Sequence, residues 1–90
     1  MSATKFPLGH IFSTPGVIQS IPNQEIVDAL MRHASGDWGD LDPEDKQAND
    51  DALVHGGRIF SAYTSSDGIR FWIITEADRS TTTILLPEEY

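Results

Sequence analysis

Apolar and polar positions alternate in the last third of the chain. Residues 58–64 and 69–76 are rich in β-branched and aromatic residues, and the polar turn Ser65–Gly68 lies between them. This turn ends in Asp-Gly, which is typical of a β-hairpin. A third segment with high β-propensity, residues 81–86, follows the segment Ala77–Ser80. The pattern predicts a three-stranded antiparallel meander.

The middle predicted strand has large apolar groups on both faces. Successive side chains of a strand point to opposite faces, so Phe71 and Ile73 share one face while Trp72 and Ile74 share the other. A sheet that is apolar on both sides needs cover on both sides. We expect helices over one face, and either the N-terminal segment or a second protomer over part of the other.

Residues 23–35 show helical spacing of apolar positions. Asn23 is a suitable N-cap, Glu25 lies in the first turn, and Gly36 is placed to end the helix. The pattern predicts a helix whose buried face is formed by Ile26, Ala29, Leu30, His33 and Ala34.

A second helix is predicted from residue 43 to residue 54 or 55. Asp42 is placed as its N-cap, Pro43 suits the first helical position, and Gly56-Gly57 would end it. The helix is very polar, so we expect it on the surface, packed along one narrow side. That side would consist of Ala48, Ala52 and Leu53.

The first 22 residues mix apolar residues with proline and glycine. Residues 11–12 and 17–21 are predicted to be short strands or extended segments around a turn at Pro15-Gly16. Prolines at this density argue against a long central strand. The whole pattern predicts a single α+β domain over residues 1–90, with two helices followed by the three-stranded antiparallel meander and room for a short N-terminal strand at one edge.

Composition and charge narrow the functional classes. The net charge is −8 and the chain contains no cysteine, so we expect neither disulfides nor thiol chemistry. Such a negative charge disfavours direct binding to nucleic acid or to anionic lipid. No apolar segment approaches the roughly 18 residues needed to span a bilayer, and the N-terminus does not resemble a signal peptide. We therefore expect a cytoplasmic protein without membrane contact.

Half of the acidic residues lie close together, between Asp37 and Asp51. This stretch contains seven acids and one lysine, Lys46, and so has a net charge of −6. Three interpretations are open: a solvated helix start, a negatively charged interaction face, or a divalent-metal site. The metal site is the weakest, since the spacing does not match an EF-hand loop. The candidate partner-binding residues are Asp37, Trp38, Asp40, Glu44, Asp45, Asp50 and Asp51.

Trp38 has two interpretations of its own. It lies within the acidic stretch, between Asp37 and Gly39, and aromatic residues are enriched at interaction hot spots. It is therefore a candidate anchor for a partner. The alternative is that Trp38 packs over the sheet and fixes the loop between the two helices.

Other groups with reactive side chains offer weaker signals. His10, His33 and His55 lack the spacing of a zinc site. The turn at 76–79 contains Glu76, Asp78 and Arg79, which would suit either a small active site or a structured turn. The chain has no phosphate-binding loop and no serine elbow. We predict that the protein is not an enzyme and needs no metal or cofactor.

Three sequence blocks resemble a known group of proteins: residues 33–50, residues 57–63 and residues 72–90. They resemble a family of similar length from plasmids and proteobacterial genomes, whose members carry labels such as "plasmid-related protein" or "type I restriction endonuclease subunit M". The resemblance covers about residues 6–90. It implies a context of mobile DNA and genome defence, and it supplies no catalytic residues.

Together these features predict a non-enzymatic, acidic accessory factor from mobile DNA. It would bind a basic protein or a nucleic-acid-binding complex and inhibit a restriction or CRISPR system by charge mimicry. The alternative is a small structural or regulatory homodimer that associates through its outer sheet face, with the acidic stretch as a solvated face only. A third hypothesis is a small hydrolase or metal-dependent enzyme centred on Glu76, Asp78 and Arg79.

Overall fold

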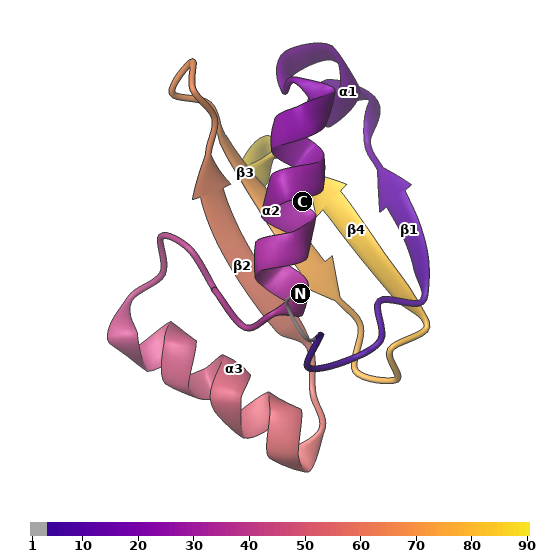
Figure 1. The fold of residues 1–90 in the computed structure, drawn as a ribbon, viewed down its shortest axis with the longest axis vertical. Coiled ribbons are helices and arrows are strands. Elements are labelled where there is room, and N and C mark those ends of the chain that lie inside the picture. Colours follow the sequence, from indigo (N-terminus) through magenta and orange to yellow (C-terminus); the bar gives the residue numbers. More distant parts are fainter. Residues whose placement is uncertain (1–3) are drawn as a thin grey trace.

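The computed structural model describes residues 4–90 as one α+β unit (Figure 1). Two helices cover one face of a sheet, and a third lies beside the sheet. In chain order the elements are β1 (His10–Ser13), α1 (Pro15–Ser20), α2 (Asn23–Ala34), α3 (Pro43–His55), β2 (Ile59–Thr64), β3 (Arg70–Thr75), β4 (Thr81–Leu85) and the 3-10 helix η1 (Pro87–Glu89).

The sheet has four strands in the order β1-β4-β3-β2. Strands β2, β3 and β4 form the predicted antiparallel meander. Strand β1 adds to the free side of β4, and this pair is parallel, with His10 opposite Thr81. The predicted meander is therefore part of a four-stranded mixed sheet; the pattern left room for a short N-terminal strand at one edge, but it did not predict the parallel pairing. The predicted strand at residues 11–12 is confirmed as part of β1.

The segment after β1 is a helix, which corrects the predicted strand or extended segment at 17–21. Thr14 is the N-cap of α1, and its side chain accepts a hydrogen bond from the backbone N–H of Val17 at 3.4 Å. Pro15 occupies the first helical position, where its missing N–H costs nothing. A capped turn therefore places Val17, which is fully buried, against the sheet.

The two longer helices match their predicted bounds closely. Helix α2 begins at Asn23 with Pro22 as its N-cap, so the prediction of Asn23 as the cap was wrong by one position. Gly36 follows the C-cap with φ of 88°, a conformation that glycine adopts without strain. Helix α3 has Asp42 as its N-cap residue and Gly56 as its C-cap, as predicted.

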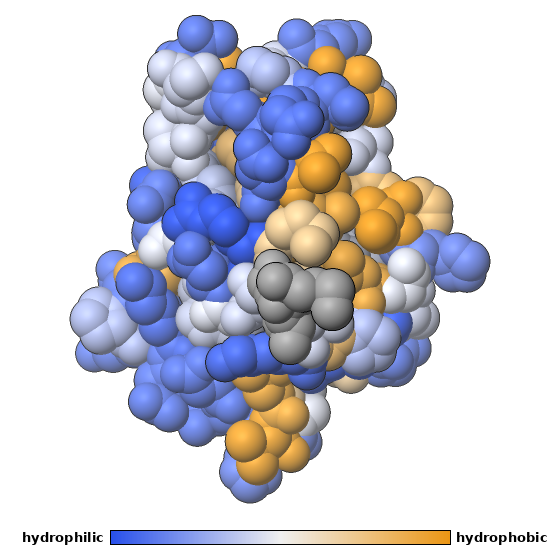
Figure 2. Space-filling model, viewed as in Figure 1, coloured by the Kyte–Doolittle hydropathy of each residue, from blue (hydrophilic) through white to orange (hydrophobic). Residues whose placement is uncertain are grey.

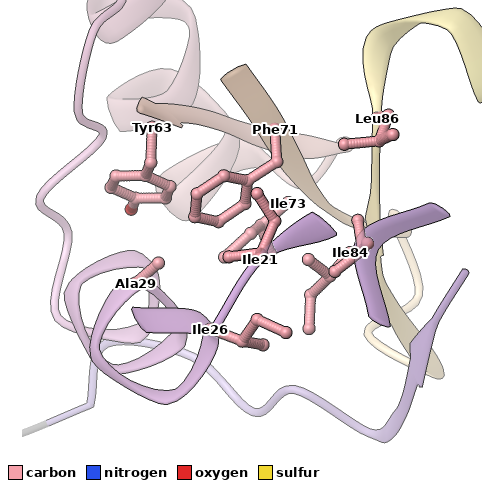
Figure 3. Close-up of a cluster of buried hydrophobic side chains, with 9 residues drawn as sticks. Ile21, Ile26, Ala29, Tyr63, Phe71, Ile73, Ile84 and Leu86 are labelled. Carbon is pink, nitrogen blue, oxygen red and sulfur yellow. The ribbon is translucent and has the colours of Figure 1, made fainter. Parts of the chain in front are cut away.

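Two apolar clusters hold the domain together. The larger one lies between the sheet and helices α1 and α2 (Figure 3), and consists of Val17, Ile21, Ile26, Ala29, Tyr63, Phe71, Ile73, Ile84 and Leu86. The smaller one attaches α3 and the N-terminal segment to the sheet, and consists of Phe6, Trp38, Ala52 and Ile59. No helix within residues 4–90 is long and apolar enough to cross a membrane.

Candidate protein-binding surface

The acidic stretch lies along the outer side of β2, where its backbone is tied to the strand. The N–H of Asp40 donates to the carbonyl of Ala62 at 2.7 Å, and the N–H of Ala62 donates to the carbonyl of Trp38 at 3.3 Å. Gly39 and Ala62 thus form a short parallel bridge. Two side chains add a further contact, because the Thr64 hydroxyl donates to a carboxylate oxygen of Asp40 at 3.0 Å. The loop therefore covers this part of the sheet edge.

One polar side chain of α3 completes this cover. The Asn49 amide nitrogen donates to the carbonyl of Phe60 at 2.6 Å, and the Phe60 N–H donates to the Asn49 amide oxygen at 3.0 Å. Asn49 is only 4% exposed. Its side chain makes the two bonds that a neighbouring strand would make. The apolar pattern of the sequence did not indicate Asn49 and placed Ala48 on the buried side, whereas Ala48 is exposed.

Trp38 is part of the core, which corrects its assignment as an exposed anchor for a partner. It is 4% exposed, and its ring lies 6.2 Å from that of Phe6 and 6.0 Å from that of His33, measured between centroids. The indole N–H donates to a carboxylate oxygen of Asp50 at 3.1 Å. The alternative interpretation is confirmed: Trp38 packs inward and fixes the loop between α2 and α3.

The acids themselves are all exposed, but they differ in their contacts. Asp37 forms an ion pair with Arg32, with hydrogen bonds of 2.7 and 3.2 Å that lower the pKa of the Asp37 carboxyl. Asp50 is bonded to Trp38, and Asp51 accepts from Gln47 at 3.1 Å. Among the described residues, no hydrogen bond or ion pair engages the side chains of Asp42, Glu44 and Asp45.

We define the acidic surface as the exposed acids of α3 and of the loop before it that are not paired with a cation: Asp40, Asp42, Glu44, Asp45, Asp50 and Asp51. Lys46 lies among them and is also exposed. At about 100° per residue, Glu44 and Asp51 share the outward side of α3 and Asp50 lies to one side of it, while Asp45 lies on the side of Asn49 and Ala52 but is exposed in the first turn. The negative charge is therefore spread around three sides of the helix.

The turn after β3 is held in one conformation by hydrogen bonds of the Arg79 and Asp78 side chains. Arg79 adopts φ of 61°, and its guanidinium donates to three backbone carbonyls, those of Ala52 at 3.0 Å, Gly57 at 2.5 Å and Glu76 at 3.1 Å. Asp78 accepts from the backbone and hydroxyl of Ser80. These contacts connect α3 to the sheet and give the turn a structural role. They do not support the hypothesis of an active site at Glu76, Asp78 and Arg79.

A buried polar network lies beneath the covered edge. The Thr82 hydroxyl donates to the carbonyl of Leu8 at 2.7 Å, so it accepts from Thr75, whose hydroxyl in turn accepts from Nε2–H of His33 at 2.9 Å. Nδ1 of His33 is therefore the acceptor, and it receives the Ser61 hydroxyl at 2.5 Å.

This hydroxyl–imidazole pair has the composition of a nucleophile and its base, but it has no access to substrate. His33, Ser61 and Thr75 are each 0% exposed. Desolvation lowers the pKa of His33 to about 4, which keeps the ring neutral near pH 7. The network is a satisfied polar core, as the position of His33 on the apolar side of its helix predicted. Among residues 4–90 no three potential ligands are grouped to hold a metal.

The outer face of the sheet carries a small aromatic cavity. Its volume is about 220 Å³, and it is lined by Arg58, Phe60, Trp72, Ile74 and Tyr90. The Tyr90 ring lies 5.8 Å from the Trp72 ring and partly covers it, while Arg58 pairs with Glu76 at 3.3 Å. The N-terminal segment, which we expected as one possible cover, instead joins the sheet edge and the helical face.

Comparison with known proteins finds no matching family model, curated protein or solved structure. What the protein binds must therefore be inferred from its own surfaces.

Proposed function

We propose that the protein is a non-enzymatic binding factor that presents its acidic surface to a basic protein surface. The observation that supports this is the exposure of all seven acids between Asp37 and Asp51, against one exposed lysine. Asp37 is the one acid of this stretch that forms an ion pair, with Arg32, among the described residues. The others are available for a partner with positive charge.

The attachment of α3 favours this role. Helix α3 is held along one narrow side, by the two hydrogen bonds of Asn49 to β2 and by the buried Ala52. Arg79 also contacts the carbonyl of Ala52 near the end of the helix. The acids are thus fixed on a docked helix rather than on a free tail, so binding would require little ordering of the acidic surface.

The charge density suggests the class of partner. The five acids from Asp42 to Asp51, less Lys46, give four net charges over about 14 Å of helix axis at ~1.5 Å per residue. This is about one charge per 3.4 Å, the value for one strand of duplex DNA. A groove that holds a nucleic-acid strand is therefore a suitable target. We propose a nucleic-acid-targeting defence complex, of the restriction or CRISPR type, as the partner that the protein inhibits.

The test uses a variant that removes charge without touching structural contacts. It combines Asp42→Asn, Glu44→Gln and Asp45→Asn, and leaves Asp37 and Asp50 intact because they bond to Arg32 and Trp38. A matched control neutralises exposed acids elsewhere, with Asp28→Asn, Asp67→Asn and Glu88→Gln.

Tagged wild-type protein and both variants are used to capture partners from a host lysate, and the captured complex is then challenged with a single-stranded oligonucleotide. We expect the wild type and the control to retain a nucleic-acid-binding complex that the oligonucleotide displaces. The neutralised variant should bind at least about tenfold more weakly, and raised salt should weaken the wild type. Equal binding by the neutralised variant would refute the proposal.

A further inference from the structure

The outer edge of β1 has no partner among residues 4–90. The N–H of His10 donates to the carbonyl of Ser80 at 2.9 Å, and the N–H of Thr14 donates to the carbonyl of Ile84 at 3.0 Å. In a strand, alternate residues direct their N–H and C=O groups to the same side. Residues 10, 12 and 14 therefore face β4, while the N–H and C=O groups of Ile11 and Ser13 point outward. We call this row of free backbone groups the β1 edge.

Large apolar side chains surround the β1 edge. Ile11 is 49% exposed, Phe12 is 55% exposed, and Ile18 of the adjoining helix α1 is 65% exposed. Figure 2 shows apolar side chains on the side of the molecule where β1 lies. The register places Phe12 beside Thr83, on the outer face of the sheet, and Ile11 beside Thr82, on the helical face.

This edge lacks most of the usual protection against pairing with another chain. Natural sheet edges are commonly shielded by charged side chains, by a bulge or by a covering segment. From Phe6 to Gln24 the chain contains no Asp, Glu, Lys or Arg, and no segment of the described residues lies over β1. Its shortness, four residues, is the one protection of this kind that it has.

We propose that the β1 edge binds the β1 edge of a second copy of this chain, forming a symmetric dimer with one continuous sheet. Because Ile11 and Ser13 are the outward residues, a two-fold axis at Phe12 pairs Ile11 with the partner's Ser13 and Ser13 with the partner's Ile11. Up to four backbone hydrogen bonds result. Phe12 then lies directly opposite the partner's Phe12, with Cβ atoms about 4.5–5.5 Å apart.

The distribution of charge favours a second copy as the occupant. Each copy has a net charge of −8, of which −6 lies in the acidic stretch beside β2, at the opposite edge of the sheet. Contact through β1 keeps the two acidic stretches as far apart as this sheet allows. A strongly charged partner would find no opposite charge on the segment from Phe6 to Gln24, and the Glu89 carboxylate beside it is already bonded to the Thr14 hydroxyl and the Gly16 N–H.

The size of the contact predicts its strength. A four-residue strand and three exposed apolar side chains from each copy would bury less than about 1,200 Å², the range of weak or transient interfaces. We therefore expect a dissociation constant on the order of micromolar. The proposed contact places the interface of a homodimer at the β1 edge of the sheet rather than on its outer face. The dimer proposal does not depend on the acidic surface.

The first test is sedimentation velocity over roughly 5 to 500 µM, a range that spans a micromolar dissociation constant. We expect a concentration-dependent shift from monomer to dimer for the wild type, loss of that shift in Phe12→Lys and in Ile18→Lys, and no change in Val54→Lys. Val54 is a matched control because it is 76% exposed on α3, at the other edge. Circular dichroism and melting curves establish that each variant is folded.

The second test uses the absence of cysteine from the chain. Phe12→Cys introduces one thiol at the two-fold axis, where the Cα atoms of a facing non-hydrogen-bonded pair lie about 4.5 Å apart, within the range of disulfides. We expect mild oxidation to crosslink Phe12→Cys rapidly, and Val54→Cys only at the slow rate of random collision. A wild type that stays monomeric at 500 µM, a dimer that persists in Phe12→Lys and Ile18→Lys, or equal crosslinking of the two cysteine variants would each overturn the proposal.

Discussion

The two edges of the sheet differ in whether their outward backbone groups have hydrogen-bond partners. At the β2 edge, the Trp38–Asp40 loop pairs with Ala62, and Asn49 satisfies both backbone groups of Phe60. Helix α3 then places its acids around this covered edge. At the β1 edge the backbone groups of Ile11 and Ser13 point outward, with apolar side chains on both sides. The strand itself has no Asp, Glu, Lys or Arg, and the Glu89 carboxylate at its end is bonded to the Thr14 hydroxyl.

This difference shows how one small sheet can present two kinds of surface. Backbone donors and acceptors at a sheet edge need partners, which the chain itself or another molecule must supply. At the β2 edge the chain supplies them, and the acids left on the outside are suited to a basic protein. At the β1 edge they are left for a partner, which we propose is a second copy. The edges should therefore respond differently to pH and to substitution.

The largest predicted effect is a loss of stability in acid, caused by the buried His33 beneath the covered β2 edge. His33 contacts Ser61 of β2 and the Trp38 ring, and its pKa is lowered from 6.5 to about 4 by burial. Between these values the unfolded chain binds a proton that the folded chain excludes, so stability falls as pH falls from about 6.5 to about 4. The total loss is on the order of 3 kcal/mol. Urea unfolding at pH 7, 5.5 and 4.5 measures it.

The control for this prediction is His33→Gln, which keeps an amide in the buried network but cannot titrate in this range. It should be less stable than wild type at pH 7 and should lose much less stability between pH 7 and pH 4.5. The carboxyls of Asp37, Asp78 and Glu89, whose pKa values are lowered by hydrogen bonds, contribute further losses at the acidic end of this range. Equal stability of the wild type at pH 7 and pH 4.5 would contradict the assignment.

Removing the side chain that covers β2 should have the next largest effect. Asn49→Ala leaves the N–H and C=O of Phe60 without their partners and opens a gap beneath α3. We expect a loss of about 2 kcal/mol in the free energy of unfolding. Gln47→Ala is the control, because Gln47 is exposed and bonds only to Asp51. It should change stability by less than about 0.5 kcal/mol.

Chemical denaturation measures the free energy of unfolding of Asn49→Ala and Gln47→Ala. Amide hydrogen exchange adds a measurement at single residues. The Phe60 amide should lose protection from exchange in Asn49→Ala while amides of the central strand β3 keep most of theirs. Similar stability of the two variants would show that Asn49 does not hold α3 to the sheet.

The elements that the sequence predicts well are those specified by local chemistry. The Asp42-Pro43 start and the Gly56 end of α3 depend on backbone requirements within a few residues, and both are confirmed. The hairpin between β2 and β3 follows from Asp67-Gly68 in the same way. The exposure of the acids was also predictable, since a carboxylate is costly to bury without a partner.

The features that the sequence did not reveal depend on contacts between distant residues. A short N-terminal edge strand was expected, but its parallel pairing with β4, about 70 residues later, was not, because a parallel pair has no turn that marks it. Asn49 is buried because its amide matches the backbone of Phe60, whereas a search for apolar periodicity selects Ala48. Trp38 gave two interpretations because its neighbours in sequence are acidic, while its neighbours in space are Phe6 and His33.

The smallest change in stability should come from the open edge. Phe12→Lys places a charge on a side chain that is 55% exposed and has no strand beyond it. In dilute solution, where the protein is monomeric, we expect the free energy of unfolding to change by less than about 0.5 kcal/mol. The same substitution abolishes the proposed dimer. The difference in melting temperature between the wild type and Phe12→Lys should therefore grow as the protein concentration is raised, because only the wild type is stabilised by dimer formation. A loss above about 1.5 kcal/mol in dilute solution would instead mean that Phe12 packs within the monomer, and the contrast with the Asn49 edge would then fail.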